Sequence, residues 1–243
     1  MKKALISIFL ADLAFLAFLM LSGFFGGVLF YVAYSLAFVL PFLTAMYFNK
    51  SDLSQSRYLS IDKYRAGIAL PLVPITVLAV IVLSVFTSII LGLLGLTDDV
   101  TIGGTLPSAL VVYALLPAVF EELLFRYLPL RLMSHKSAKT TVLLSALLFS
   151  AVHLDPFQLV YAFAAGAIFM TVDIMTDSVI PSIVIHFINN ALSVLTFFLQ
   201  DYPIFIRAYL PTLLVLSVLA VINIASRRAE YSYIFRKKLL YAN

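Results

Sequence analysis

The stretch LPSALVVYALLPAVFEELLFRYLPL, residues 106–130, decides the fold class of this chain. It is long and apolar enough to cross a lipid bilayer, because a spanning helix needs about 20 mostly apolar residues. Its second half nevertheless contains Glu121, Glu122 and Arg126. Ionisable side chains in the middle of such a segment cost about 2.5–3.5 kcal/mol each to insert. The stretch therefore predicts a membrane helix whose ionisable side chains have a structural or functional role.

The composition of the whole chain agrees with a membrane protein. Of the 243 residues, 63% are hydrophobic and 12% are charged, whereas soluble domains are about 45–50% apolar and about 25% charged. These values exclude a soluble enzyme or a nucleic-acid-binding module, and the net charge of +4 comes from basic residues at the ends of apolar runs. The chain has no Cys, which excludes disulfides, a thiol nucleophile and a lipidated Cys.

Apolar runs along the chain predict an all-α polytopic protein of about eight transmembrane helices, in a single domain over residues 1–243. We place the helices at 4–21, 25–48, 66–96, 106–130, 140–153, 157–175, 178–199 and 209–225. The third run is too long to cross straight, so we expect it to tilt, or to break near Pro71 or Pro74. The bundle is expected to enclose a polar intramembrane cavity, with a catalytic core at about 106–199.

The distribution of Lys and Arg predicts that both termini are cytoplasmic. With that orientation, 14 of the 16 Lys and Arg residues lie inside, and Arg207 is the one outside, as the positive-inside rule requires. The weak point is the loop between the sixth and seventh spans, which has Asp173 and Asp177 but no basic residue. His135 lies in a basic loop, and we interpret it as a surface residue.

The acidic pair in the fourth span divides into two expected roles. Glu122 and Arg126 are four residues apart with Glu on the N-terminal side, a spacing that favours an ion pair on a helix. Adjacent helix positions point about 100° apart, so we expect Glu121 and Glu122 to have different partners. We interpret Glu122–Arg126 as a structural pair and Glu121 as the group left for chemistry. The alternative is that the three groups only satisfy one another near the membrane surface.

Two later spans each present polar side chains at positions i and i+4. Phe149 and His153 share one face at the end of the fifth span, and His186 and Asn190 share one face of the seventh. Taken alone, His153 equally fits a hydrogen-bonded interfacial His, and His186 with Asn190 fits bonding between membrane helices.

Together, Glu121, His153, His186 and Asn190 suit the hydrolysis of an amide by water. A carboxylate and imidazoles can activate water as general bases, and an imidazole and a carboxamide can donate hydrogen bonds to an oxyanion. Neither a G-x-S-x-G nor an H-E-x-x-H motif is present. The preferred mechanism needs no cofactor. A zinc site made of Glu121, His153 and His186 stays open as an alternative, because two His and one carboxylate form a known catalytic zinc set.

At these residues the chain resembles the CPBP family, which contains the glutamate-dependent type II CAAX prenyl proteases and bacterial relatives that process bacteriocins or give immunity to them. The family has three motifs, E-E-x-x-x-R, F-x-x-x-H and H-x-x-x-N/D. The matches are Glu121, Glu122 and Arg126 for the first, Phe149 and His153 for the second, and His186 and Asn190 for the third. All occur in order on separate predicted spans.

The resemblance implies an intramembrane endopeptidase in which Glu121 and His153 activate water and His186 and Asn190 form the oxyanion hole. It implies that Glu122, Arg126 and Phe149 support these groups. The expected partners are a peptide or prenylated-protein substrate and the lipid bilayer, with no nucleic acid. We expect the cavity to open towards the cytoplasm or the cytoplasmic leaflet.

Two other functions stay open at the level of the sequence. The first is a non-catalytic immunity or scaffold protein that keeps the fold and binds a partner. The second is a proton-coupled transporter, since intramembrane acids and His also form proton relays. It would be supported if Asp12, Asp173 and Asp177 lined a path with Glu121, but the repeat symmetry of many transporters is lacking.

Overall fold

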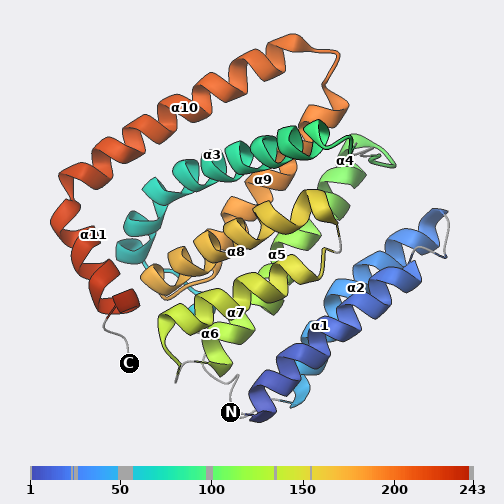
Figure 1. The fold of residues 1–243 in the computed structure, drawn as a ribbon, viewed down its shortest axis with the longest axis horizontal. Helices are drawn as coiled ribbons and strands as arrows, with labels where there is room; N and C mark the ends of the chain where they lie inside the picture. Colours follow the sequence, from blue (N-terminus) through green and yellow to red (C-terminus); the bar gives the residue numbers. More distant parts are fainter. Residues whose placement is uncertain are drawn as a thin grey trace.

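The computed structural model describes residues 2–22, 24, 27–48, 57–96, 101–133, 136–153 and 155–240, and these contain helices and no strand. The prediction of an all-α fold is therefore confirmed for this part of the chain (Figure 1). In chain order the helices are α1 (Lys2–Ser22), α2 (Gly27–Phe48), α3 (Lys63–Leu93), α4 (Leu106–Ala109), α5 (Leu116–Glu122), α6 (Leu128–Leu132), α7 (Ala138–Ala151), α8 (Pro156–Thr176), α9 (Ile180–Phe198), α10 (Pro203–Ser226) and α11 (Arg228–Phe235).

Five segments of the described chain are helical, long and apolar enough to cross a membrane. They are Lys63–Leu93, Leu106–Leu132, Gln158–Thr176, Ile180–Phe198 and Arg207–Ser226. Helix α7 has only 14 residues, which at 1.5 Å per residue is shorter than the roughly 30 Å hydrocarbon core. The count of eight spans therefore stays a prediction, and His135 and part of the α1–α2 region lie outside the described residues.

Helix α3 is continuous through both of its internal prolines. It runs for 31 residues with Pro71 and Pro74 inside it, so of the two expected alternatives the break does not occur, and tilting remains the way to accommodate its length. Asp62 caps its first turn by accepting a hydrogen bond from the Arg65 backbone N–H at 2.8 Å. This N–H and the Arg65 guanidinium hold the pKa of Asp62 below its ordinary value.

The stretch that carries the acidic pair is one helix with two wider turns. Between α4, α5 and α6 lie π-helical turns at Leu110–Leu115 and Leu123–Tyr127, each just before a proline. Proline has no N–H and clashes with the carbonyl four residues earlier, which explains why the helix widens there. The Phe125 carbonyl, four residues before Pro129, accepts a hydrogen bond from Ser145 of α7 at 2.6 Å. This bond ties α7 to the acidic helix.

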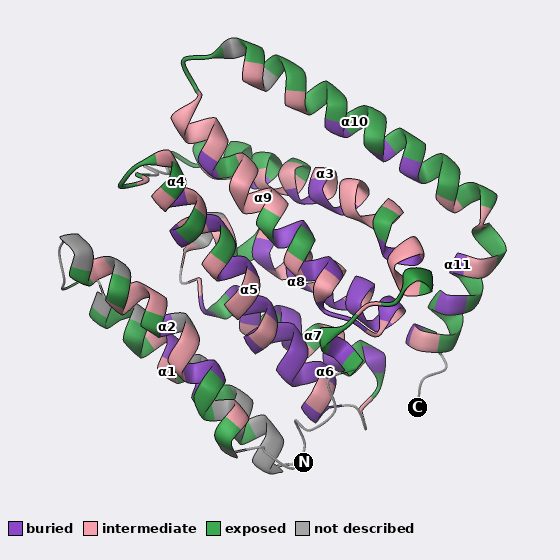
Figure 2. Ribbon diagram, turned by 180° about the vertical axis from the view of Figure 1, so that it is seen from behind, coloured by how far each residue is buried: buried purple, intermediate pink, exposed green. Residues whose placement is uncertain are grey.

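Buried residues concentrate on the helices in the middle of the bundle. Figure 2 shows them mainly on α5, α6, α7 and α8, whereas α10 is mostly exposed on the outside. One core cluster joins α1 and α2 to the acidic helix and α7, with Phe42, Tyr127 and Phe149 among its members. A second joins α3, α8, α9 and α10 through Val77, Phe169 and Leu213. An exposed apolar outer face is what a helix in lipid requires.

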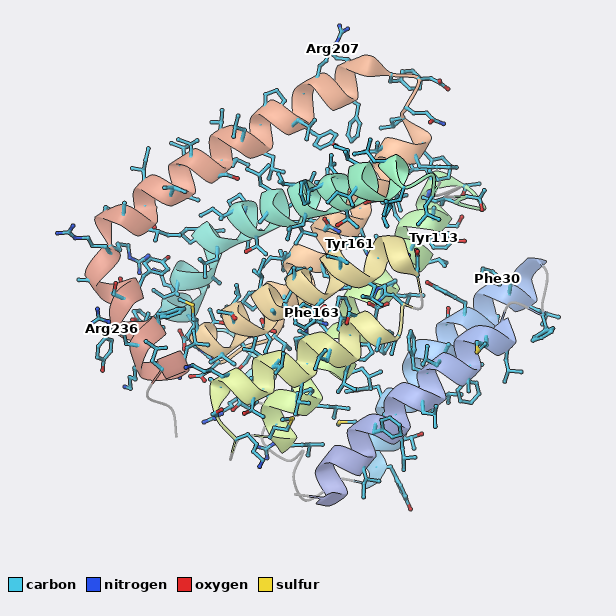
Figure 3. The ribbon with its side chains drawn as sticks, in the orientation of Figure 1. Phe30, Tyr113, Tyr161, Phe163, Arg207 and Arg236 are labelled. Carbon is cyan, nitrogen blue, oxygen red and sulfur yellow. The ribbon has the colours of Figure 1, made fainter. Side chains whose placement is uncertain are left out.

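The basic residues gather at one end of the helices, which we call the basic end. It contains the starts of α3 and α7, the end of α6, and the segment from Arg227 to Lys238. All Lys and Arg residues whose side chains the structure describes, except Arg126 and Arg207, lie there. In Figure 3 the labelled Arg236 lies at this end and Arg207 at the opposite one.

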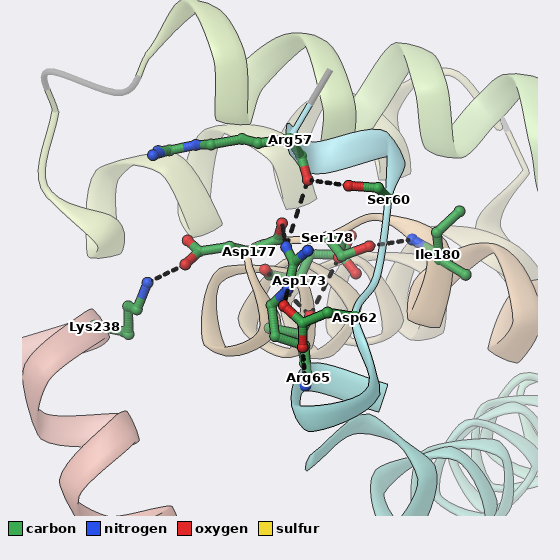
Figure 4. Close-up of polar contacts among 10 residues, drawn as sticks. Arg57, Ser60, Asp62, Arg65, Asp173, Asp177, Ser178, Ile180 and Lys238 are labelled. Atoms are coloured by element: carbon green, nitrogen blue, oxygen red, sulfur yellow. Dashed lines mark hydrogen bonds and ion pairs between the residues drawn. The ribbon is translucent and has the colours of Figure 1, made fainter. Parts of the chain in front are cut away.

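The acidic turn that was the weak point of the topology prediction is neutralised at the basic end by residues from elsewhere in the chain. Asp173 is not in the loop but buried inside α8, and Asp177, with a positive φ of 47°, forms the turn that follows. The Asp177 carboxylate pairs with Lys238, and its carbonyl accepts a hydrogen bond from Arg65 at 2.9 Å (Figure 4). The turn therefore needs no basic residue of its own.

Candidate active site

The four residues predicted to be catalytic line a single pocket. Glu121 comes from α5, His153 from the turn after α7, and His186 and Asn190 from α9. The pocket has a volume of about 360 Å³ and is also lined by α8 and by residues of α1, α2 and α3. The structure thus brings together side chains that are up to 69 positions apart in the sequence.

Glu122 and Arg126 form the expected pair at the back of the site. Arg126 Nε lies 3.2 Å from Glu122 Oε2, and both side chains are fully buried. The guanidinium also lies over the Phe149 ring, at 3.9 Å from its centroid, and faces Phe169 at 5.4 Å. These rings attract the cation through their electron-rich faces. Among the described residues, the guanidinium nitrogens have no hydrogen-bond partner. The buried positive charge of Arg126 is therefore stabilised mainly by the Glu122 carboxylate and by the two rings.

His186 lies between the two carboxylates, which corrects one expectation from the sequence. Its Nδ1 is 2.7 Å from Glu122 Oε1, and its Nε2 is 3.9 Å from Glu121 Oε2. Adjacent carboxylates were expected to have different partners, but both approach the same imidazole. They can do so because the two nitrogens are on different edges of the ring.

The hydrogen bond of His153 fixes which of its nitrogens is basic. Nδ1 lies 2.7 Å from the Phe149 carbonyl oxygen, which can only accept, so Nδ1 carries the proton. In the neutral ring, Nε2 then has the lone pair and can act as a base. The Phe149 and His153 rings meet edge to face, with centroids 4.8 Å apart.

Phe149 is the packing centre of the site. Its ring contacts His186 edge to face at 5.9 Å as well as His153 and Arg126. Gly166 of α8 lets α7 approach closely at this point, because a Cβ there would lie 3.2 Å from Phe149 Cδ1 and 3.1 Å from Ala146 Cα. One aromatic residue therefore holds both imidazoles and the guanidinium in position.

Several residues of the pocket were not predicted from the sequence. They are aromatic or amide side chains of the pocket wall, namely Tyr34, Tyr113, Tyr161, Gln158 and Asn189; Figure 3 labels Tyr113 and Tyr161. Asn189 donates a hydrogen bond to Asn190 Oδ1 at 3.4 Å. Its place beside Asn190 was a usable signal, whereas an isolated Tyr in an apolar run looks like an ordinary core residue.

Asp173 is a third buried carboxylate near the site, and its hydrogen bonds go to Ser182. It accepts hydrogen bonds from the Ser182 hydroxyl at 2.7 Å and from the Ser182 backbone N–H at 3.3 Å. These bonds fix the start of α9 against the end of α8, four residues before His186. Asp173 is not among the residues that line the pocket, nor is Asp177, and the side chain of Asp12 lies outside the description.

Zinc binding at Glu121, His153 and His186 stays a prediction. Among the described residues, no three or more His, Asp and Glu side chains form a group that could hold a metal ion, and Glu121, His153 and His186 are among the residues considered. His186 Nδ1 and His153 Nδ1 are each used in a hydrogen bond, which leaves Nε2 as the nitrogen of each ring that could bind a metal. The mechanism proposed below contains no step through a metal.

Comparison with known proteins gives a family for the central part of the chain. Residues 103–192 match the family described as Rce1-like, type II CAAX prenyl endopeptidase. No curated protein and no solved structure matches the chain. The matched segment contains all three motifs, so the resemblance to the CPBP family is confirmed there. With its long apolar helices, the chain is an integral membrane protein whose residues 103–192 carry the sequence pattern of a type II CAAX prenyl endopeptidase.

Proposed function

We propose that this protein is an intramembrane, glutamate-dependent endopeptidase. The observation that carries the proposal is the convergence of Glu121, His153, His186 and Asn190 on one pocket inside an otherwise apolar bundle. The family match supports a peptidase. The proposed orientation has both termini in the cytoplasm, as the charge distribution favours.

In the proposed reaction, Glu121 accepts a proton from a water molecule while the water oxygen attacks the carbonyl carbon of the scissile peptide bond. His153 Nε2, the basic nitrogen of that ring, orients the same water. The negative charge that develops on the carbonyl oxygen is stabilised by hydrogen bonds from His186 and from the Asn190 amide. The C–N bond then breaks, and the proton taken from water passes to the leaving amine.

The contacts of His186 add a condition to its role. A neutral ring that donates from Nδ1 to Glu122 has only a lone pair at Nε2, and such a nitrogen cannot donate to an oxyanion. His186 therefore acts as a donor when it carries both protons. An acceptor lies beside each of the two nitrogens, Glu122 Oε1 at Nδ1 and Glu121 Oε2 at Nε2.

The experiment that tests the proposed function is a cleavage assay with the purified protein in lipid nanodiscs. A farnesylated peptide with a C-terminal CAAX sequence is compared with the same peptide without the prenyl group and with an apolar peptide without Cys. Mass spectrometry of the products identifies the bond that is cut. Cleavage by the wild type, lost in Glu121→Ala, is expected. Unchanged cleavage in Glu121→Ala, or no cleavage of any peptide, contradicts the proposal.

Two experiments distinguish the proposed function from its two main alternatives. If the protein is an immunity or scaffold protein, Glu121→Gln leaves the phenotype of the host cell unchanged. If it is the proposed peptidase, Glu121→Gln abolishes that phenotype. For a zinc-dependent peptidase, dialysis against a chelator removes activity and added zinc restores it. The activity proposed here survives chelation, because Glu121 and not a metal activates the water.

A further inference from the structure

The active-site pocket continues into a second cavity, which we call the mouth groove. The groove has a volume of about 630 Å³ and shares part of its wall with the pocket. The shared residues are Tyr113, Gln158, Tyr161, Asn189 and Asn190. Because the oxyanion residue Asn190 belongs to both walls, an elongated ligand in the groove would lead directly to the catalytic groups.

The mouth groove lies at the end of the helices that is opposite the basic end. Its walls are the second half of α3, with Ser84 and Ser88, and the second half of α9, with Ser193 and Thr196. Both helices start at the basic end and run away from it. Residue Gln200, just after α9, also lines the groove. The active site therefore opens away from the basic end.

The chemistry of the walls selects one kind of occupant. None of the described residues that line the mouth groove is charged, and hydroxyl and amide side chains alternate with apolar ones. Uncharged hydrogen-bonding groups match the N–H and C=O groups of an extended polypeptide, which must find partners when water is removed. A charged side chain in the groove would lose its hydration without gaining a partner.

Given the proposed peptidase function, we infer that the substrate reaches Glu121 from the membrane face opposite the basic end, as an uncharged extended stretch of polypeptide lying in the mouth groove. With cytoplasmic basic loops, this face is extracytoplasmic. The sequence predicted cytoplasmic termini and also a cavity that opens towards the cytoplasm. These two predictions conflict, because the groove opens at the end opposite the basic loops. The geometry favours substrates that are exported polypeptides or parts of membrane proteins outside the cell.

The side of access is tested by single-cysteine labelling, since the natural chain has no Cys. Ser193→Cys places a thiol in the groove, and Ser60→Cys, before α3 at the basic end, is the matched control; both positions are exposed. A membrane-impermeant maleimide is expected to label Ser193→Cys in intact cells and Ser60→Cys only in inside-out vesicles. Ser88→Cys, on the opposite wall, is the second groove reporter.

Two labelling results overturn the inference. One is the reaction of the groove and control variants from the same side of the membrane. The other is failure of both Ser193→Cys and Ser88→Cys to react in intact cells. These measurements need no enzymatic activity, so they are independent of the proposed function.

The route of the substrate is tested on the purified variants. A bulky maleimide attached at Ser193→Cys is expected to lower kcat/KM for an uncharged peptide at least about tenfold, because binding energy away from the scissile bond is lost. The same label on Ser60→Cys leaves cleavage unchanged. If fully labelled Ser193→Cys still cleaves normally, the groove is not the route although the peptidase function stands. If the unlabelled wild type cleaves no peptide, the peptidase function fails instead.

Discussion

At the scale of residues, neighbouring carboxylates acquire different roles from their contacts. Glu122 is fully buried between Arg126 and His186 Nδ1, whereas Glu121 faces the pocket and lies at the longer distance of 3.9 Å from His186 Nε2. The spacing of Glu122 and Arg126 predicted their ion pair correctly. The shared imidazole could not be predicted, because it depends on how α9 is rotated against α5.

Glu122→Gln is expected to destabilise the protein strongly. Removing one partner of a buried ion pair leaves the other charge uncompensated, at a cost of about 3–5 kcal/mol. The measurement is the unfolding of the detergent-solubilised protein with increasing SDS. Glu230→Gln is the matched control, because Glu230 pairs with Arg227 at a partly exposed site and should have little effect. Equal stability of the two variants would show that Glu122 is not the counterion of Arg126.

Asn190→Ala is expected to lower kcat about 10²–10³-fold, the usual effect of losing one oxyanion donor. Asn223→Ala is the control, because Asn223 is an exposed residue of α10, away from the pocket. Steady-state kinetics on a cleaved peptide provide the readout. A change in KM with kcat unchanged would assign Asn190 to substrate binding rather than to the oxyanion.

At the scale of elements, hydrophobic runs predicted the helices well and their internal irregularities poorly. The eight predicted runs all coincide with helices of the structure, with ends that differ by a few residues in most cases. The π-helical turns before Pro117 and Pro129 were not predicted. Proline signals a disturbed helix, but in α3 two prolines are accommodated without a break. Whether a helix breaks, bends or widens depends on the neighbours that satisfy its free carbonyls.

Gly166→Ala is expected to disturb the site through the contact between α7 and α8. The added methyl group would press on the Ala146 backbone and the Phe149 ring, and overpacking of this kind costs about 1–3 kcal/mol. The variant should unfold at a lower temperature and cleave more slowly, because Phe149 positions both imidazoles. In Gly92→Ala, a Cβ meets nothing within 4 Å, so stability should not fall. Equal melting temperatures for both variants and the wild type would contradict this packing.

At the scale of the whole molecule, the positions of the charged residues distinguish the two ends of the helices, whereas hydrophobicity does not. The positive-inside argument used positions along the sequence only, so it could not include the contacts of Asp177 with Lys238 and Arg65. These contacts place an acidic turn at the basic end without conflict. The convergence of the three motifs was predictable from their order on separate spans. The mouth groove was not, because its walls carry no motif.

The orientation of the whole molecule gives a prediction of its own. A green fluorescent protein fused after residue 243 should fluoresce, because its chromophore forms in the cytoplasm. Alkaline phosphatase fused at the same point should be inactive, because it needs an oxidising compartment. Active phosphatase and no fluorescence would reverse the proposed orientation.

The central claim is that the Glu121 carboxylate activates the water that cuts the peptide bond. The most direct test is the single-turnover cleavage rate of Glu121→Gln, which keeps the size of the side chain and removes its basicity. Loss of a general base predicts a rate about 10²–10⁴-fold lower, with the unfolding temperature close to that of the wild type. A folded Glu121→Gln variant that cleaves at the wild-type rate would contradict the claim.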